Sequence, residues 1–290
     1  MIISIIGLGL IGGSFALALK NNYPDWVIQG FDVNAENLQF ALIKRIIEKE
    51  VSVKEAMKSS DIIFLAMPVD EIERMLPHIL GKNTNQIIVD FGSTKKHIAD
   101  VVKENPFRRN YIAAHPMAGT EYSGPQAADV DLFEGKYCII CDKELSHNPY
   151  LETVEAIFRK LKIRVEYLSS SDHDHALAYL SHLSHVSSFA LANSIFSDKS
   201  ILDDNIKLSG GGLLSTIRLA NSNATMWIPI LMQNSENVIH ALDEYIDNLC
   251  KIRTFIQHND TLKLGEFIHR ANYAYRKYNL RNPKIITNEN

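Results

Sequence analysis

The chain has 290 residues, of which 46% are hydrophobic, and its formal net charge is −4. A chain of this length and composition can bury one large core or two ordinary ones. The weak negative charge excludes a basic field that would attract nucleic acid or an anionic membrane, so we expect neither as a partner. No window offers the roughly 20 apolar residues of a membrane-spanning helix.

The N-terminal residues MIISIIGLGLIGG are apolar, but they lack a basic start and run into glycines. We therefore interpret them as a first strand rather than a signal peptide. The three cysteines are few and odd in number, which favours a reducing, cytoplasmic location. Cys138 and Cys141 lie in the strand-like run KYCIIC, where residues three apart point to opposite faces, so we expect packed thiols and no metal site.

Short apolar runs alternate with amphipathic stretches from residue 1 to about residue 167. This alternation predicts βαβ units and hence an α/β fold, with an N-terminal Rossmann-type, doubly wound, mostly parallel sheet over residues 1–168. The amphipathic stretches include Ser14–Asn21, Glu71–Leu80 and Glu152–Leu161. The apolar runs are Ile2–Ile6, Val27–Phe31, Ile62–Ala66, Ile87–Asp90, Tyr111–Ala114, Tyr137–Cys141 and Ile163–Tyr167.

A glycine fingerprint follows the first run directly. Gly7, Gly9 and Gly12, with Leu10 and Ile11 between them, form G-x-G-x-x-G between a predicted strand and a predicted helix. In that context the glycines permit a tight turn, a close approach to a pyrophosphate and close packing of the helix, whose N-terminus then faces the anion. A glycine-rich turn with no ligand is the alternative. FAD proteins share the fingerprint, but nothing further in the chain suggests FAD.

Asp32 ends the second apolar run, twenty residues after Gly12. An acid there would accept hydrogen bonds from the ribose hydroxyls of the adenosine and repel a 2′-phosphate, which favours NAD over NADP. Its alternative role is to cap the helical stretch Ala35–Leu42.

Two later strand ends are expected at the same cleft, because ligands bind beyond the carboxyl ends of parallel strands. Met67 and Pro68 follow one of them, and Ser93 and Thr94 follow the other. We expect both loops to border a nicotinamide. Either Ser93 or Thr94 could instead be an ordinary helix N-cap.

His115 stands at the end of the next strand, followed by Pro116, which fixes the backbone. A hydride leaves a carbinol carbon readily only if the hydroxyl proton is drawn away, and a neutral imidazole can accept that proton near pH 7. We therefore interpret His115 as a catalytic base. A lone histidine at a strand end would more often be structural, but the predicted dinucleotide cleft favours catalysis.

Stretches with a 3.6-residue period dominate after residue 170. We predict an all-helical substrate and dimerisation domain over residues 169–280 and a flexible polar tail over 281–290. Long apolar faces favour a homodimer, although the core of an intramolecular bundle would use them equally. The stretches are Asp172–Phe196, Ile228–Leu249, Lys251–His258 and Thr261–Tyr278.

Asp174 and His185 lie eleven residues apart in the first of these stretches. Eleven residues are close to three helical turns, so we predict that the two side chains share a face. The carboxylate would then orient the imidazole and raise its pKa. His175 and His182 share another face, and we interpret them as solvent-exposed or packing residues.

Five motifs in series resemble those of the prephenate dehydrogenases, which include arogenate and broader cyclohexadienyl dehydrogenases. They are GLGLIGGS, DFGSTK, AAHPMAGTEYSG, SHLSH, and SGGGLLSTIRLA followed by MW, and the resemblance runs from residue 1 to about 280. It implies NAD-dependent oxidative decarboxylation of prephenate to 4-hydroxyphenylpyruvate in tyrosine biosynthesis. It also implies the single-function form, without a chorismate mutase segment or a regulatory domain.

The resemblance assigns roles residue by residue. His115 matches the catalytic histidine that bonds the substrate hydroxyl, and Ser93 matches the serine that links this histidine, the hydroxyl and the nicotinamide. His185 matches a substrate-binding histidine, and Asp174 matches its acidic companion.

Three further matches complete the set. Arg218 matches the arginine that holds a substrate carboxylate, a task that suits its planar guanidinium. Glu121 matches a site-gating acid, with a solvated loop carboxylate as the alternative. Trp227 matches a tryptophan of the second domain, where an apolar core role is equally open.

One position departs from the pattern. Leu214 stands where some relatives carry a basic residue, four positions before the arginine. The choice between prephenate and arogenate therefore stays open, as does the network of Glu121. Two other interpretations of the function remain. One is a hydroxyacid or imino-reducing dehydrogenase, a class that usually relies on a lysine in the second domain, and the other is an NAD-sensing protein without turnover.

Overall fold

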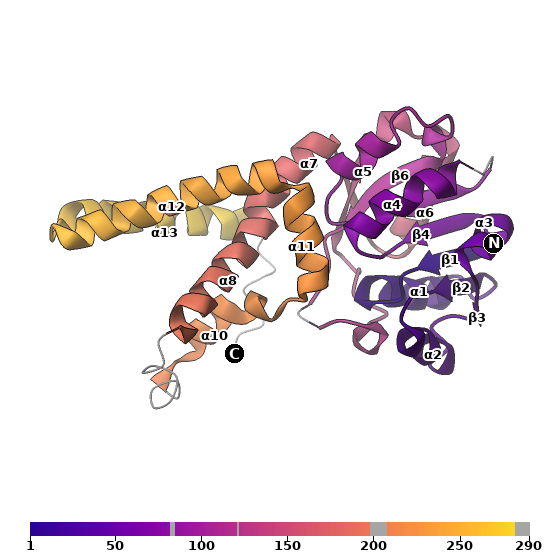
Figure 1. Cartoon of the computed structure of the whole chain (residues 1–290), viewed down its shortest axis with the longest axis horizontal. Coiled ribbons are helices and arrows are strands. Elements are labelled where there is room, and N and C mark those ends of the chain that lie inside the picture. The colour runs from indigo at the N-terminus through magenta and orange to yellow at the C-terminus, as the bar shows by residue number, and fades with distance from the viewer. Residues whose placement is uncertain (82–84, 121, 198–207, 282–290) are drawn as a thin grey trace. The chain divides into compact units, whose positions relative to one another are not determined.

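The computed structural model describes residues 1–81, 85–120, 122–197 and 208–281 (Figure 1). The chain divides into two compact units, Met1–Val238 and Ile239–Asn290. The larger unit contains the whole sheet and the helical segments that follow it as far as Val238. The predicted tail, residues 281–290, lies outside the described residues except for Arg281, which is the last residue of a helix.

An eight-stranded sheet forms the centre of the larger unit, in the order β3-β2-β1-β4-β5-β6-β7-β8. All neighbouring strands are parallel except β6 and β7. This is the doubly wound, mostly parallel sheet that the alternating pattern predicts. The strands are β1 (Ile2–Ile6), β2 (Val27–Phe31), β3 (Lys49–Glu50), β4 (Ile62–Leu65), β5 (Ile87–Asp90), β6 (Tyr111–Pro116), β7 (Tyr137–Cys141) and β8 (Arg164–Leu168).

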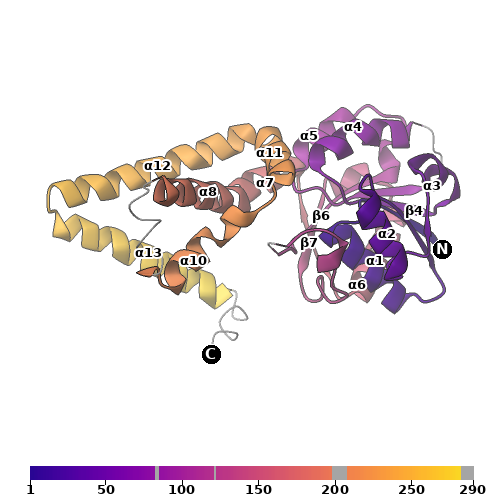
Figure 2. The same cartoon turned by 60° about the horizontal axis from the view of Figure 1, so that its bottom comes forward.

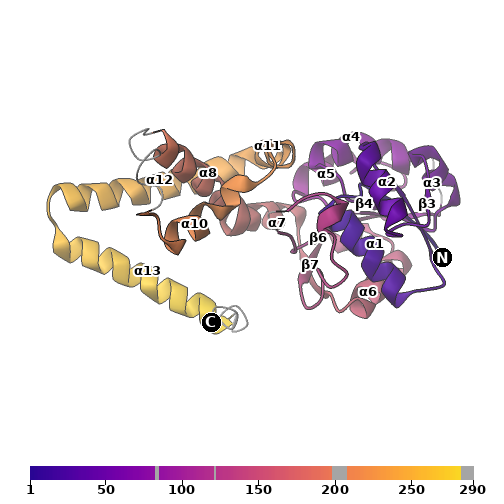
Figure 3. The same cartoon turned by 90° about the horizontal axis from the view of Figure 1, so that it is seen from below.

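Helices cover both faces of this sheet, with α1 and α6 on one face and α4 and α5 on the other (Figure 3). The first core lies between the sheet and the helices α1 and α6, and the second core lies between the sheet and α4 and α5. Phe15 of α1 belongs to the first core, where its ring lies 4.6 Å from that of Phe64. Cys138 belongs to the first core and Cys141 to the second, so the two free thiols do point to opposite faces. The helices are α1 (Leu10–Asn22), α2 (Ala35–Ile43), α3 (Val53–Ser59), α4 (Val69–Leu80), α5 (Lys96–Val101) and α6 (Asn148–Lys160).

Short helices continue the larger unit after β8. The predicted helix Asp172–Phe196 is interrupted by a π-helical turn at Ala178–His182. Trp227 and Ile230 join the second core, which is why this compact unit extends past the predicted boundary at 168/169 to Val238. The elements are α7 (Ser170–Leu177), the π turn η4, α8 (Leu183–Phe196), α10 (Gly211–Ile217), the 3₁₀ turn η6 (Arg218–Asn221) and α11 (Ala224–Gln233).

Two long helices account for the described part of the smaller unit, α12 (Ser235–Gln257), which begins at the end of the larger unit, and α13 (Thr261–Arg281). They join at a tight turn (Figure 2), where Asn259 adopts a φ of 51°. The sequence pattern placed a break near residue 250, but α12 runs through it. In the part of the chain that the structure describes, no helix has the length and apolarity to cross a membrane.

Candidate active site

The glycine loop joins β1 to α1, and packing accounts for two of its three glycines. Gly7 has a φ of +94°, and a Cβ there would lie 2.4 Å from the carbonyl oxygen of Ala66. A Cβ on Gly12 would lie 1.9 Å from the carbonyl oxygen of Gly7. Gly9 has nothing within 4 Å of the same position, so no protein neighbour explains its missing side chain. Open space beside Gly9 is what a closely approaching ligand requires.

The N-terminus of α1 is suited to an anion. The helix begins at Leu10 with Gly9 as its N-cap, and no side chain caps it. The first N–H groups of a helix have no intrahelical partner, and the helix dipole adds positive potential there. These groups, including those of Leu10 and Ile11, are therefore available to a phosphate.

Asp32 lies against this loop. Its carboxylate accepts the backbone N–H of Leu8 at 2.7 Å and that of Asn34 at 2.8 Å. Met67 is also adjacent, because its backbone nitrogen lies 3.0 Å from the Cβ position of Gly7, and Pro68 is the N-cap residue of α4. The structure thus brings the predicted cofactor residues of β1, β2 and β4 to one edge of the sheet.

His115 is the penultimate residue of β6, and its side chain contacts α7. Its Nδ1 lies 2.8 Å from Nε2 of His173, and Nδ1 of His173 lies 2.7 Å from Oδ1 of Asp174. Desolvation of the ring, together with His173 and the cation of Lys95, holds the pKa of His115 well below its ordinary value. The imidazole is therefore neutral near pH 7, as a proton acceptor must be.

Asp174 also serves as the cap of α5. Its two carboxylate oxygens accept the backbone N–H groups of Lys95 at 2.8 Å and Lys96 at 2.9 Å. Neither Ser93 nor Thr94 caps this helix, which corrects that interpretation. Thr94 instead donates from its hydroxyl to Gln233 at 2.6 Å, and no hydrogen bond of the Ser93 hydroxyl is found among the described residues.

A buried ion pair lies beneath the end of β6. The ammonium group of Lys95 pairs with Asp90 and donates to the carbonyl oxygen of Ala114 at 2.8 Å, and neither charged side chain is exposed. Tyr111 donates its hydroxyl to the other oxygen of Asp90. Sequence reasoning missed this lysine, although DFGSTK places it five residues after an acid at a strand end.

His185 and Trp227 meet in the helical part of the larger unit. Their rings stack with centroids 3.6 Å apart, and Nδ1 of His185 donates to the carbonyl oxygen of Ser181 at 3.1 Å. Burial lowers the pKa of His185, and the nearby cation of Arg218 lowers it further. Predicted substrate residues of α8, η6 and α11 therefore lie together.

The prediction that Asp174 and His185 share a face is wrong. The π turn advances less than 100° per residue, so α8 is rotated out of phase with α7. The acid contacts His173 instead of His185, and His182, the last residue of the π turn, is buried. Burial lowers the pKa of His182 to about 4, and its Nδ1 lies 3.2 Å from the amide nitrogen of Asn234.

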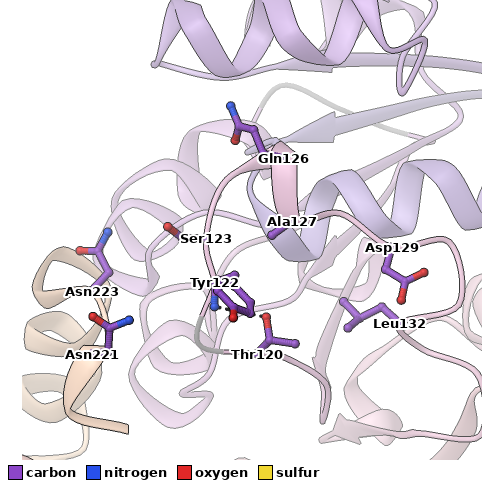
Figure 4. Close-up of a pocket in the computed structure, with 9 residues that line it drawn as sticks. All are labelled: Thr120, Tyr122, Ser123, Gln126, Ala127, Asp129, Leu132, Asn221 and Asn223. Atoms are coloured by element: carbon purple, nitrogen blue, oxygen red, sulfur yellow. Dashed lines mark hydrogen bonds between the residues drawn. The ribbon is translucent and has the colours of Figure 1, made fainter. Parts of the chain in front are cut away.

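Glu121 lies outside the described residues. Its neighbours Thr120 and Tyr122 border a pocket of about 800 Å³, which Figure 4 shows between the loop after β6 and the start of α11. The backbone N–H of Asp129 in this loop donates to Ser14 of α1 at 2.9 Å, which holds the pocket beside the glycine loop. His115 is not among the residues that line it. The lining residues are Thr120, Tyr122, Ser123, Gln126, Ala127, Asp129, Leu132, Asn221 and Asn223.

Two family models match the chain. The model described as prephenate dehydrogenase, nucleotide-binding domain, matches residues 15–167, and the model described as prephenate dehydrogenase, dimerization domain, matches residues 169–270. The chain belongs to the prephenate dehydrogenase family. The glycine loop precedes the first matched residue, so its interpretation rests on the geometry above.

Individual proteins with similar sequences and structures belong to the same family. The prephenate dehydrogenase of Bacillus subtilis is 29% identical over 273 residues, which cover 93% of this chain and 74% of that protein. The cyclohexadienyl dehydrogenase of Zymomonas mobilis is 28% identical over 263 residues, 89% of each. The crystal structure of the Aquifex aeolicus prephenate dehydrogenase, in complex with hydroxyphenyl propionate and NAD+, has a TM-score of 0.85 at 28% identity, covering 96% of this chain and 98% of that chain.

Proposed function

We propose that this chain catalyses the NAD-dependent oxidative decarboxylation of prephenate to 4-hydroxyphenylpyruvate. The observation that carries the proposal is the place of His115 at the carboxyl end of β6, where burial holds its pKa well below the ordinary value, in the same sheet whose strand β1 leads into the uncapped N-terminus of α1. The relatives named above are dehydrogenases of prephenate or of cyclohexadienyl substrates. These two enzymes support oxidoreductase chemistry more firmly than they support one substrate.

The residues at the glycine loop fit NAD. Gly9 leaves open space, and the uncapped N-terminus of α1 would hold the pyrophosphate. Asp32 already accepts two backbone N–H groups, but each carboxylate oxygen has two lone pairs, so ribose hydroxyls can still donate to it. When bound, NAD would supply the hydride acceptor, and Met67 and Pro68 would border it.

In this proposal His115 draws the proton from the ring hydroxyl of the substrate through Nε2, since Nδ1 is engaged with His173. The hydroxyl carbon loses its hydride to the acceptor and becomes a carbonyl. Carbon dioxide leaves from the opposite ring position, the electrons of that bond move through the ring to the carbonyl oxygen, which regains a proton as a phenol, and aromatisation drives the reaction. Ser93 would bond the same hydroxyl. His185 and Arg218 would bind substrate carboxylate, with Asp174 acting on the opposite side through His173 and Glu121 gating the entrance.

Asp32→Ser is expected to relax the preference for NAD, because it removes the ribose acceptor and the charge that repels a 2′-phosphate. Hydrogen bonds to charged groups contribute about 1.5–3 kcal/mol, so the ratio of kcat/KM for NAD to that for NADP should fall by roughly tenfold to a hundredfold. Steady-state kinetics with both cofactors measure this ratio. Asp25→Ser, at an exposed turn, is the control. An unchanged ratio would show that Asp32 is only a structural residue of the loop.

Arg218→Ala is expected to raise KM for the substrate roughly tenfold to a hundredfold while kcat changes less, because it removes a charged partner of a carboxylate. Initial rates over a range of substrate concentrations give both constants. Arg253→Ala, an exposed arginine of α12, serves as the control. If KM stays within twofold, Arg218 has no part in substrate binding.

Arogenate is the second candidate substrate. Two observations favour arogenate as a candidate: the similarity to a cyclohexadienyl dehydrogenase, and the apolar Leu214 four positions before Arg218. Purified protein should be assayed with prephenate and with arogenate, each with NAD and with NADP, by absorbance of the reduced cofactor. Turnover of prephenate with NAD supports the proposal, and turnover of arogenate alone replaces the substrate. Cofactor binding without turnover of either would instead indicate an NAD-sensing protein.

We also propose a cytoplasmic homodimer. The second matched model describes a dimerization domain, and α12 exposes Ile239, Ile246, Leu249 and Ile256 at spacings that place them along one side. A second copy of the chain would cover these side chains. The three free cysteines accord with a reducing compartment. Sedimentation at micromolar concentration tests the dimer.

A further inference from the structure

Two buried residues next to His115, His173 and Asp174, touch no reacting atom in the chemistry proposed above, and their effect on His115 has still to be specified. His173 is 0% exposed and Asp174 is 2% exposed, and both lie on α7, which Figure 1 shows next to α5. Together with His115 they form an unbroken series of hydrogen bonds, at 2.8 and 2.7 Å. Burying such polar groups is costly unless every partner is matched, so the direction of each bond can be read from the chemistry of the atoms.

The direction follows from Asp174. Both of its oxygens accept backbone N–H groups, which can only donate, so the carboxylate is an acceptor throughout. Nδ1 of His173 must therefore carry the proton that it shares with Oδ1. A neutral His173 then has a lone pair on Nε2, and the proton between the two imidazoles belongs to Nδ1 of His115.

We propose that His173 and Asp174 are positioning residues that hold His115 in the tautomer with its proton on Nδ1. This leaves the lone pair of Nε2 as the one basic site of the imidazole, free to accept the substrate proton. The inference rests on the proposed function for its purpose, but the tautomer itself exists or fails without any substrate.

The surroundings of Asp174 make the arrangement rigid. The carboxylate is fixed to the first turn of α5, and the side-chain amide of Asn234 donates to the backbone carbonyl of Asp174 at 2.7 Å. Asp174, and with it His173, is thus held by the start of α5 on one side and by Asn234, at the end of α11, on the other. The series ends at a buried carboxylate that accepts three hydrogen bonds and donates none. It therefore orients His115 rather than carrying the proton away.

The direct test is the nitrogen NMR spectrum of the protein labelled with ¹⁵N-histidine, at a pH near 7.5. Long-range proton–nitrogen correlations show which ring nitrogen carries the proton, and the signal missing from His115→Asn identifies His115. We expect the proton on Nδ1. A wild-type His115 with its proton on Nε2 would overturn the proposal, and this readout needs no variant of α7 to fold.

Two substitutions of His173 add a test of consequence. His173→Leu removes the acceptor, so the tautomer should shift toward Nε2 and kcat should fall about a hundredfold, within the range for loss of a general base, while KM stays within threefold. His173→Gln restores an acceptor, because its amide nitrogen donates to Asp174 and its oxygen then faces His115. It should keep the Nδ1 proton and lose less than tenfold in kcat.

His175→Leu, on the exposed side of the same helix, is the matched control and should change neither readout. If His173→Leu leaves both the tautomer and kcat unchanged, His173 is a packing residue and the proposal is wrong. The two claims fail separately. If His115 carries its proton on Nδ1 but the protein turns over neither prephenate nor arogenate, only the proposed function is wrong. If the protein turns over its substrate fully but His115 carries its proton on Nε2, only the positioning role is wrong.

Discussion

His115→Asn is expected to lower kcat about a thousandfold, because a positioned general base contributes roughly 10² to 10⁴ in rate. Asparagine retains a polar side chain at the end of β6 but has no lone pair of comparable basicity to accept a proton. The affinity for NAD should stay within threefold, since the glycine loop is untouched. Single-turnover kinetics and NAD titration by fluorescence measure the two quantities.

The pH dependence gives an independent check on the same residue. Desolvation, His173 and Lys95 hold the pKa of His115 well below the ordinary 6.5, and only the neutral form accepts a proton. The rate constant kcat/KM should therefore be level through pH 7 and decline only as the pH falls well below 6.5. A decline centred at or above pH 7, or turnover unchanged in His115→Asn, would contradict the assignment.

Lys95→Met is expected to lower the free energy of unfolding by about 3–5 kcal/mol, the usual cost of removing one partner of a buried ion pair. The substitution leaves Asp90 fully buried, with Tyr111 and the backbone N–H of Gly92 as its remaining partners among the described residues, and it removes the donor to Ala114. Denaturant titration followed by circular dichroism measures the loss.

Lys96→Met is the matched control for this prediction. The Lys96 side chain is exposed and pairs with Asp100 one turn on, and such surface pairs contribute about 0.3–0.5 kcal/mol. Removing the Lys95 cation also removes a cause that lowers the pKa of His115, so the acid limb of the pH profile should move to higher pH. Equal stability of the two variants would show that the buried pair is not a structural requirement.

The fold could be predicted from sequence because its pattern is local. Seven apolar runs correspond to seven of the strands, and the opposite orientation of Cys138 and Cys141 follows from strand geometry alone. The two-residue strand β3 and the seven-residue helix α3 were missed, since neither is long enough to show a period.

Without the family resemblance, residue position alone could place a candidate site residue only where its side chain stands at a strand end. Asp174 was predicted to contact His185 rather than His173, because a π turn changes the helical phase between them and no residue type in the sequence indicates such a turn. His173 was overlooked because its partner, His115, lies 58 residues away. Lys95 was overlooked because a lysine is ordinarily solvent-exposed, and its burial depends on Asp90 and on the neighbouring strand.

A crystal structure of the protein with NAD and hydroxyphenyl propionate, the compound bound in the Aquifex aeolicus relative, tests the central claim most directly. We predict that the phenolic oxygen lies within hydrogen-bond reach, about 2.6–3.2 Å, of Nε2 of His115, with the ring over the nicotinamide. A ligand bound far from His115, or a nucleotide bound away from Gly9 and Asp32, would contradict the account.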